Sequence, residues 1–124
     1  MREINFRAWN KKEKFLDTAW SIDFEHGEVC HRAHNMSDLD DCILMQYTGL
    51  KDKNGQEIYE GDITIDGYGT VTVIENDGFQ WLERVLKLRD RHISKEILIM
   101  TKANAFRCEV IGNLYENPEL LEGE

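Results

Sequence analysis

Two cysteines and two histidines lie close together in one polar stretch, and they are the first residues that could do chemistry. The four candidates are Cys30, His31, His34 and Cys42. Thiolate and imidazole groups are the ligands that zinc prefers, and four of them complete a tetrahedral site. The spacing matches no standard zinc knuckle, and Asp38, Asp40 or Asp41 could replace any of the four. The alternative interpretation is a polar loop in which these residues are incidental.

Cysteine catalysis is a second possibility. Cys30 stands beside His31, but neighbours in sequence do not form a catalytic dyad, because the two groups must meet across space. No loop typical of an oxyanion hole is apparent. Cys108 alternates with Phe106 and Val110, which predicts a thiol in the hydrophobic core. We therefore expect no catalytic cysteine.

Five aspartates offer a third route to chemistry, since carboxylates can hold a divalent cation or form an acid–base pair. They are Asp38, Asp40, Asp41, Asp62 and Asp66. Acidic residues are abundant in this chain, so clustering by chance is expected. Asp62 directly follows Gly61, and the interpretation we favour is that its carboxylate accepts backbone N–H groups at a bend.

Aromatic residues near turns indicate a surface for binding. Tyrosine and tryptophan are favoured at interfaces because they combine an apolar ring with a polar end. The candidate interaction surface consists of Trp9, Tyr47, Tyr59, Asp62 and Tyr68. For Trp9 and Tyr59 the alternative is packing between two lobes of the fold.

The formal net charge of -9 argues against a nucleic-acid partner, because an acidic surface repels phosphates. The local exception is the basic segment Arg84–Lys95, which predicts either a phosphate-binding patch or a solvated loop or edge. No Gly-rich phosphate loop is present. No apolar run approaches the roughly 20 residues that cross a bilayer, and the N-terminus lacks the apolar region of a secretory signal. We expect a cytoplasmic protein with reduced cysteines and no membrane partner.

Alternating apolar and polar residues predict the elements that must position these groups. Residues 2–9 and 16–24 alternate, which predicts two strands joined as a β-hairpin. Residues 29–42 show no clear period, and residues 37–41 within them favour a short helical turn or a loop.

Further short strands and turns are predicted in the rest of the chain. The expected strands are 43–47, 58–60, 63–65, 70–74, 97–100 and 106–111, with a turn at Gly49 and another over 52–55. Asn54-Gly55 favours a type I′ turn, which needs positive φ at both residues. We expect residues 83–96 to form a charged connection. Residues 117–121 predict a short helical turn, because an Asn precedes Pro118.

Three separated motifs give the sequence its family resemblance. They are Arg-Glu-Ile-Asn-Phe-Arg-Ala-Trp at 2–9, Met-Gln-Tyr-Thr-Gly-Leu-Lys-Asp-Lys-Asn-Gly at 45–55 followed by Glu-Ile-Tyr-Glu-Gly-Asp-Ile at 57–63, and Glu-Val-Ile-Gly-Asn-Leu-Tyr-Glu-Asn-Pro-Glu-Leu-Leu at 109–121. Together they resemble the YopX family of small proteins encoded by bacteriophages and prophages. The resemblance implies a small SH3-like β-barrel in the C-terminal lobe and a phage or prophage origin in a bacterial cytoplasm. It supplies no catalytic residues and no cofactor.

We therefore predict a mainly β fold with two parts and a short C-terminal helical turn. Residues 1–42 would form an N-terminal β-hairpin region and a variable loop, and residues 43–124 an SH3-like barrel lobe, unless both join in one compact unit. We expect a phage or prophage accessory protein that acts as a non-enzymatic protein-interaction module without a cofactor. Its partner would be a host or phage protein, or a second copy of the chain. The alternatives are a nucleic-acid-associated small barrel and a metal-dependent enzyme.

Overall fold

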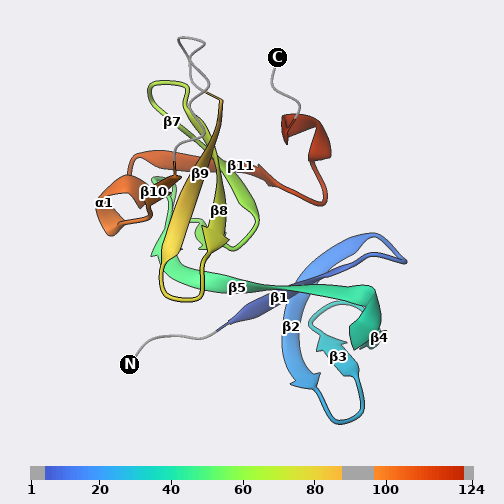
Figure 1. Ribbon diagram of the computed structural model, residues 1–124. Coiled ribbons are helices and arrows are strands. Elements are labelled where there is room, and N and C mark those ends of the chain that lie inside the picture. Colours follow the sequence, from blue (N-terminus) through green and yellow to red (C-terminus); the bar gives the residue numbers. More distant parts are fainter. Residues whose placement is uncertain (1–4, 88–96, 122–124) are drawn as a thin grey trace. The chain divides into compact units, whose positions relative to one another are not determined.

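The computed structural model describes residues 5–87 and 97–121, and these residues form a mainly β protein (Figure 1). The strands are β1 (Phe6–Asn10), β2 (Phe15–Asp23), β3 (Glu28–His31), β4 (Ser37–Asp38), β5 (Cys42–Lys51), β6 (Glu57–Tyr59), β7 (Asp62–Asp66), β8 (Val71–Asn76), β9 (Trp81–Lys87), β10 (Ile97–Ile99) and β11 (Cys108–Asn113). The helical turns are η1 (Leu39–Asp41), α1 (Lys102–Ala105) and η2 (Pro118–Leu121). The strands make two antiparallel sheets, ordered β4-β3-β2-β1-β5-β6 and β10-β9-β8-β7-β11.

The chain divides into two compact units, residues 1–47 and 48–124. The sequence placed the division after residue 42, which is where β5 begins. Because β5 continues to Lys51, the change from one unit to the next lies inside a strand and not in a linker.

The first unit confirms the predicted N-terminal hairpin and adds strands to it. β1 and β2 pair antiparallel, with Ala8 opposite Asp17. β3 and β4 extend this pairing through residues that were expected to form a variable loop. Both strands are too short for a period of two to be read from the sequence. The expected helical turn within 37–41 is present as η1.

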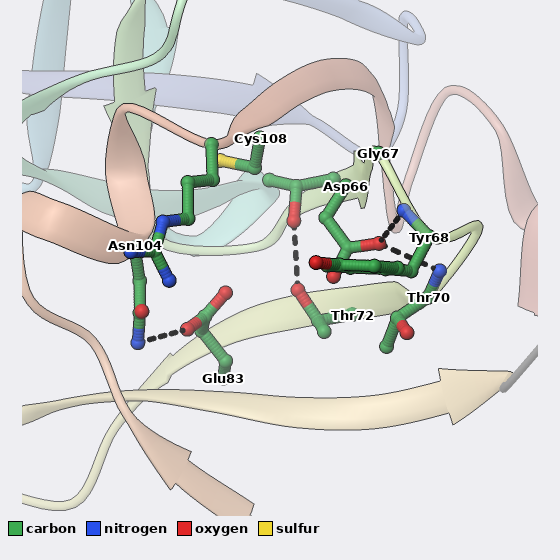
Figure 2. Close-up of a pocket in the computed structure, with 10 residues that line it drawn as sticks. Asp66, Gly67, Tyr68, Thr70, Thr72, Glu83, Asn104 and Cys108 are labelled. Atoms are coloured by element: carbon green, nitrogen blue, oxygen red, sulfur yellow. Dashed lines mark hydrogen bonds between the residues drawn. The ribbon is translucent and has the colours of Figure 1, made fainter.

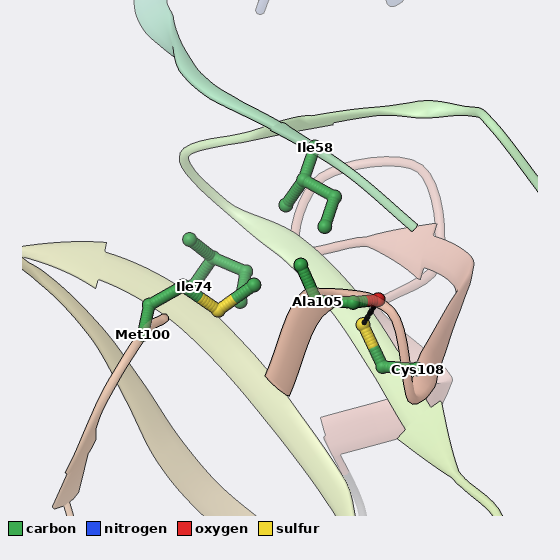
Figure 3. Close-up of a cluster of buried hydrophobic side chains, with 5 residues drawn as sticks. All are labelled: Ile58, Ile74, Met100, Ala105 and Cys108. Atoms are coloured by element: carbon green, nitrogen blue, oxygen red, sulfur yellow. Dashed lines mark hydrogen bonds between the residues drawn. The ribbon is translucent and has the colours of Figure 1, made fainter. Parts of the chain in front are cut away.

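The second unit confirms the predicted β7–β8 hairpin, in which Thr64 lies opposite Thr72. Within residues 5–87 and 97–121 the strand pairing closes no barrel, so only the coarser prediction of a mainly β fold is confirmed. Its hydrophobic cluster is formed by Ile58, Ile74, Met100, Ala105 and Cys108 (Figure 3). The predicted helical turn near the C-terminus is η2.

Four local predictions in this unit are wrong. Residues 83–87 belong to β9 and do not form a loop. Gly49 lies inside β5, with a φ of 86°, and not at a turn. Phe106 ends the unpredicted helix α1 and is exposed, because β11 starts only at Cys108. Asn54 does not adopt positive φ, so the turn at Asn54-Gly55 is not type I′.

A buried carboxylate, that of Asp52, organises this turn. Its Oδ1 accepts hydrogen bonds from the N–H groups of Asn54 and Gln56, both at 2.9 Å. Its Oδ2 accepts the N–H of Val110 on β11, also at 2.9 Å. Beside it, the N–H of Lys53 donates to the carbonyl of Cys108 at 3.0 Å. The turn and strand β11 are therefore fixed to each other across a long sequence separation.

Replacing Asp52 by Ala should destabilise the protein strongly. The change leaves three backbone N–H groups without their acceptor, and one of them belongs to a different strand. We expect the free energy of unfolding to fall by about 3 kcal/mol, measured by urea denaturation. Asp77→Ala is the matched control, because Asp77 also accepts two backbone N–H bonds but lies in an exposed turn. Equal losses for the two variants would contradict the bridging role of Asp52.

Gly112 allows a close approach between β11 and the segment that precedes η2. A Cβ built on this residue would lie 2.5 Å from Oδ1 of Asn117, and that same oxygen accepts the N–H of Asn113 at 3.2 Å. Gly67, in contrast, has open space around the position of a Cβ.

Gly112→Ala should therefore lower the free energy of unfolding by about 1–3 kcal/mol, because the methyl group displaces the Asn117 side chain. Gly67→Ala should be neutral or slightly stabilising, since alanine restricts the unfolded chain. Thermal unfolding of both variants checks the pair. A tolerated Gly112→Ala would show that the Asn117 contact is dispensable.

Candidate functional site

A pocket of about 450 Å³ lies within the second unit. Its lining residues are Thr64, Asp66, Gly67, Tyr68, Thr70, Thr72, Glu83, Asn104, Arg107 and Cys108. They come from β7, β8 and the turn between them, from β9, and from the region of α1 and the start of β11 (Figure 2). The volume falls in the range of small-ligand sites.

The register of the sheet explains why polar residues gather here. Residues that face each other across antiparallel strands point to the same side of the sheet. Thr64 pairs with Thr72, Asp66 with Cys108, and Glu83 with Ile74. The polar side chains therefore share one face with Ile74 and Cys108 of the hydrophobic cluster. The pocket therefore lies at the polar end of this sheet face, and the hydrophobic cluster lies at its apolar end.

The turn between β7 and β8 is shaped by Asp66. Its Oδ1 accepts the N–H groups of Tyr68 and Thr70, at 2.8 and 3.0 Å. This arrangement leaves Tyr68 78% exposed, and Figure 2 shows its ring beside the Asp66 carboxylate at the pocket. The aromatic side chain is held at the pocket by a structured turn.

Glu83 is a charged residue on the inner face of β9, and it is only 6% exposed. Asn104 Nδ2 donates to its Oε2 at 3.3 Å, and Asn104 is positioned by α1, whose N-cap Thr101 accepts the Asn104 N–H at 3.1 Å. Burial raises the pKa of Glu83 and outweighs the hydrogen bond from Asn104, which lowers it, while the nearby charge of Asp66 adds a smaller rise.

Cys108 forms part of the pocket wall and also of the hydrophobic cluster, as the sequence predicted. Its Sγ donates to the carbonyl of Ala105 at 3.4 Å (Figure 3). Burial, with a smaller contribution from the charge of Glu83, raises the pKa of this thiol to about 11. The thiol is therefore protonated at neutral pH and a poor nucleophile.

The four candidate zinc ligands lie in the first unit and form no metal-binding group there among the described residues. Cys30 and His31 are consecutive on β3, so their side chains point to opposite faces. His34 Nδ1 pairs with Asp17 Oδ2 at 2.8 Å. Within residues 5–87 and 97–121, no group of three or more His, Cys, Asp or Glu side chains is placed to hold a metal ion.

His31 and Cys42 instead adjoin a buried polar cluster around Ser37. His31 Nε2 lies 2.7 Å from Ser37 Oγ, and Asn10 Nδ2 donates to the same oxygen at 2.8 Å. The ring of Phe15 packs edge-on against His31. Burial lowers the pKa of His31 and raises the pKa of the Cys42 thiol, so both groups favour their neutral forms.

The predicted interaction residues are dispersed. Tyr68 is exposed, Trp9 and Tyr59 are half-buried, and Tyr47 and Asp62 are buried, which removes the last two from the candidate surface. Asp62 Oδ2 accepts the N–H of Tyr59 at 2.8 Å, and this is the bend role that we favoured for it.

The other charged candidates contribute less to the pocket. Of the five aspartates only Asp66 lines it, whereas Asp38 lies on β4 and Asp40 and Asp41 on η1. In the basic segment Arg84–Lys95, the Arg84 guanidinium forms an ion pair with Glu75 on β8, and residues 88–96 lie outside the described residues.

Sequence reasoning missed Glu83 and Asn104. The alternation of Trp81, Glu83 and Val85 is a signal that could have placed Glu83 on an inward face. Its charge made a solvated connection the simpler interpretation. Asn104 had no comparable signal, because α1 has only four residues.

Comparison with known proteins identifies the family. A family model described as YopX protein matches residues 5–122. The chain belongs to the YopX family. The three motifs that carried the resemblance lie almost wholly within this match, and the resemblance is confirmed.

One solved structure supports the fold of this YopX chain. The crystal structure of protein EF1440 from Enterococcus faecalis has a TM-score of 0.72 and 24% sequence identity, and the comparison covers 98% of this chain and 99% of that one. No curated protein matches the sequence. Among the described helices, none has the length and apolar character needed to span a membrane.

Glu83→Gln should stabilise the protein in a pH-dependent way. The pKa of Glu83 is higher in the folded state than its ordinary value of 4.5, so wild-type stability falls as pH rises above 4.5 and levels off above the folded-state pKa. The neutral variant avoids this loss. We expect it to be more stable than wild type by on the order of 1 kcal/mol at pH 7.5 and nearly equal at pH 4.

Urea denaturation from pH 4 to 8 measures this difference. Glu119→Gln, at an exposed position on η2, is the control and should leave the profile unchanged. A stability difference for Glu83→Gln that does not vary with pH would contradict the assigned titration.

Proposed function

We propose that this YopX protein is a non-enzymatic protein-interaction module whose binding element is the pocket of the second unit. The observation that carries the proposal is an open pocket with a buried carboxylate, Glu83, on its wall and an exposed aromatic ring, Tyr68, beside it. Polar groups held at fixed positions in a pocket give orientation and specificity, and an exposed tyrosine gives contact area to a partner.

The surroundings of the reactive groups favour binding over catalysis. Cys108 is kept protonated by its raised pKa, and Oδ1 of Asp66 is occupied by the turn that it shapes. Glu83 accepts from the Asn104 amide, which is neither a base nor a strong nucleophile at neutral pH. These features are those of a recognition site with fixed acceptors.

The family supports a wider setting for this proposal. We infer a phage or prophage accessory protein in the cytoplasm of a bacterial host, with a host or phage protein as partner and self-association as a further mode. For the C-terminal lobe, residues 43–124, we retain an SH3-like barrel as a proposal. Its support is the antiparallel order of five strands opened by the β7–β8 hairpin.

The two alternatives have weaker support. A nucleic-acid role rests on the segment Arg84–Lys95, of which Arg84 is paired with Glu75, and it is opposed by the net charge of -9. A metal-dependent enzyme would need the ligands around Cys30 and Cys42 to converge, and Cys30 and His31 point to opposite faces because they are consecutive on β3.

Site-specific photocrosslinking tests the interaction role. A benzophenone amino acid at position 68 should crosslink to a discrete protein in bacterial cells that carry the phage or prophage, because Tyr68 is exposed beside the pocket. Position 79 is the matched control, since Phe79 is 97% exposed and does not line the pocket. Mass spectrometry identifies the adduct and distinguishes a partner from a second copy. Absence of an adduct at position 68, or the same adducts at both positions, would contradict the proposal.

A further inference from the structure

Glu83 places a buried acceptor on the wall of the pocket. Among the described residues none forms an ion pair with it, and the Asn104 amide donates a hydrogen bond to it. A buried carboxylate that lacks a counter-charge is costly, and a ligand that brings a positive charge relieves that cost. The site therefore favours a cation.

Two hydroxyls stand on the same pocket wall as this carboxylate. Thr64 Oγ1 and Thr72 Oγ1 lie 2.7 Å apart, and either hydroxyl can be the donor in the hydrogen bond between them. A carboxylate has about four lone-pair positions, so Glu83 retains room for N–H donors from a ligand.

A second carboxylate and an aromatic ring stand at the same pocket. Both turn bonds of Asp66 go to Oδ1, so its Oδ2 can accept from a ligand. Figure 2 shows the Tyr68 ring next to that carboxylate. A planar group with several N–H donors suits this arrangement, because guanidinium stacks on aromatic rings and bonds carboxylates through a rigid fork.

Resting on the proposed function, we propose that the pocket receives an arginine side chain of the protein partner, with the guanidinium bonded to Glu83 and stacked on Tyr68. Arg107 also lines the pocket, and its exposed side chain forms no ion pair with Glu83 among the described residues. Its charge disfavours a second cation, so an arginine followed by acidic or uncharged residues is preferred over a polybasic segment.

Titration of the ¹⁵N-labelled full chain with short peptides tests this assignment. The probe is acetyl-Gly-Arg-Gly-amide, and the matched controls carry citrulline, which has nearly the same shape without the charge, or lysine. We expect the amide signals of Thr64, Asp66, Thr72 and Asn104 to shift with the arginine peptide. Citrulline should bind at least about tenfold more weakly, and lysine also more weakly, because charge-assisted bonds are the stronger ones.

Three variants separate a cation site from an anion site. Glu83→Gln should weaken binding of the arginine peptide at least about tenfold, whereas Arg107→Gln should leave it unchanged or tighten it. Glu119→Gln, outside the pocket, should have no effect. Binding should also strengthen as pH rises, because the ionised carboxylate is the form that holds the guanidinium.

The opposite pattern overturns the assignment. Stronger binding after Glu83→Gln with weaker binding after Arg107→Gln would indicate an anionic ligand, and preferential binding of guanosine monophosphate as probe would indicate a nucleobase site. The arginine assignment would also be refuted if the citrulline or the lysine peptide bound as tightly as the arginine peptide. It would equally be refuted if none of the three peptides bound. If the arginine assignment fails but crosslinking at position 68 still captures a partner, the proposed interaction role stands. If the arginine peptide binds but position 68 captures no partner, only the interaction role is refuted.

Discussion

The carboxylate of Asp52 is the interaction on which the arrangement of the second unit depends. It joins the turn at residues 52–56 to the N–H of Val110, fifty-eight positions along the chain. β11 carries Cys108 into the hydrophobic cluster and follows directly after α1, which supplies Asn104 to the pocket. The turn at residues 52–56, which looks like a purely local turn in the sequence, thus helps to fix a wall of the pocket.

The pocket and the core share one face of the five-stranded sheet, and this explains the unusual environment of Glu83. Ile74 and Cys108 bury apolar surface at one end of the face, while Thr64 and Thr72 bring hydroxyls to the other. Departures of this kind from a uniformly apolar interior are typical of functional sites. Burial near the core raises the pKa values of both Glu83 and Cys108. Glu83 serves there as a hydrogen-bonding group, whereas the Cys108 thiol serves as a packing group.

Much of the fold could be predicted from the sequence where strands are long and alternate clearly. The β1–β2 and β7–β8 hairpins are of this kind. The helical turn η2 could be predicted from a different signal, the Asn that precedes Pro118. The short strands β3 and β4 could not be predicted, because their pairing is decided by neighbouring strands and not by their own pattern. The pocket was also beyond reach, since it requires the register that sets Thr64 opposite Thr72 and Glu83 opposite Ile74. Asp66 and Tyr68 were singled out, but only as separate residues near a turn.

The contacts at the outer side of β11 also bear on how copies of this protein can meet. Residues 108 and 110 direct their backbone polar groups away from β7, toward the position where a further strand would add. Lys53 occupies the carbonyl of Cys108, and Asp52 occupies the N–H of Val110. An open strand edge is a template for aggregation, and covering it is a common protection. The turn at residues 52–56 therefore also blocks the addition of a strand from a second molecule at these positions.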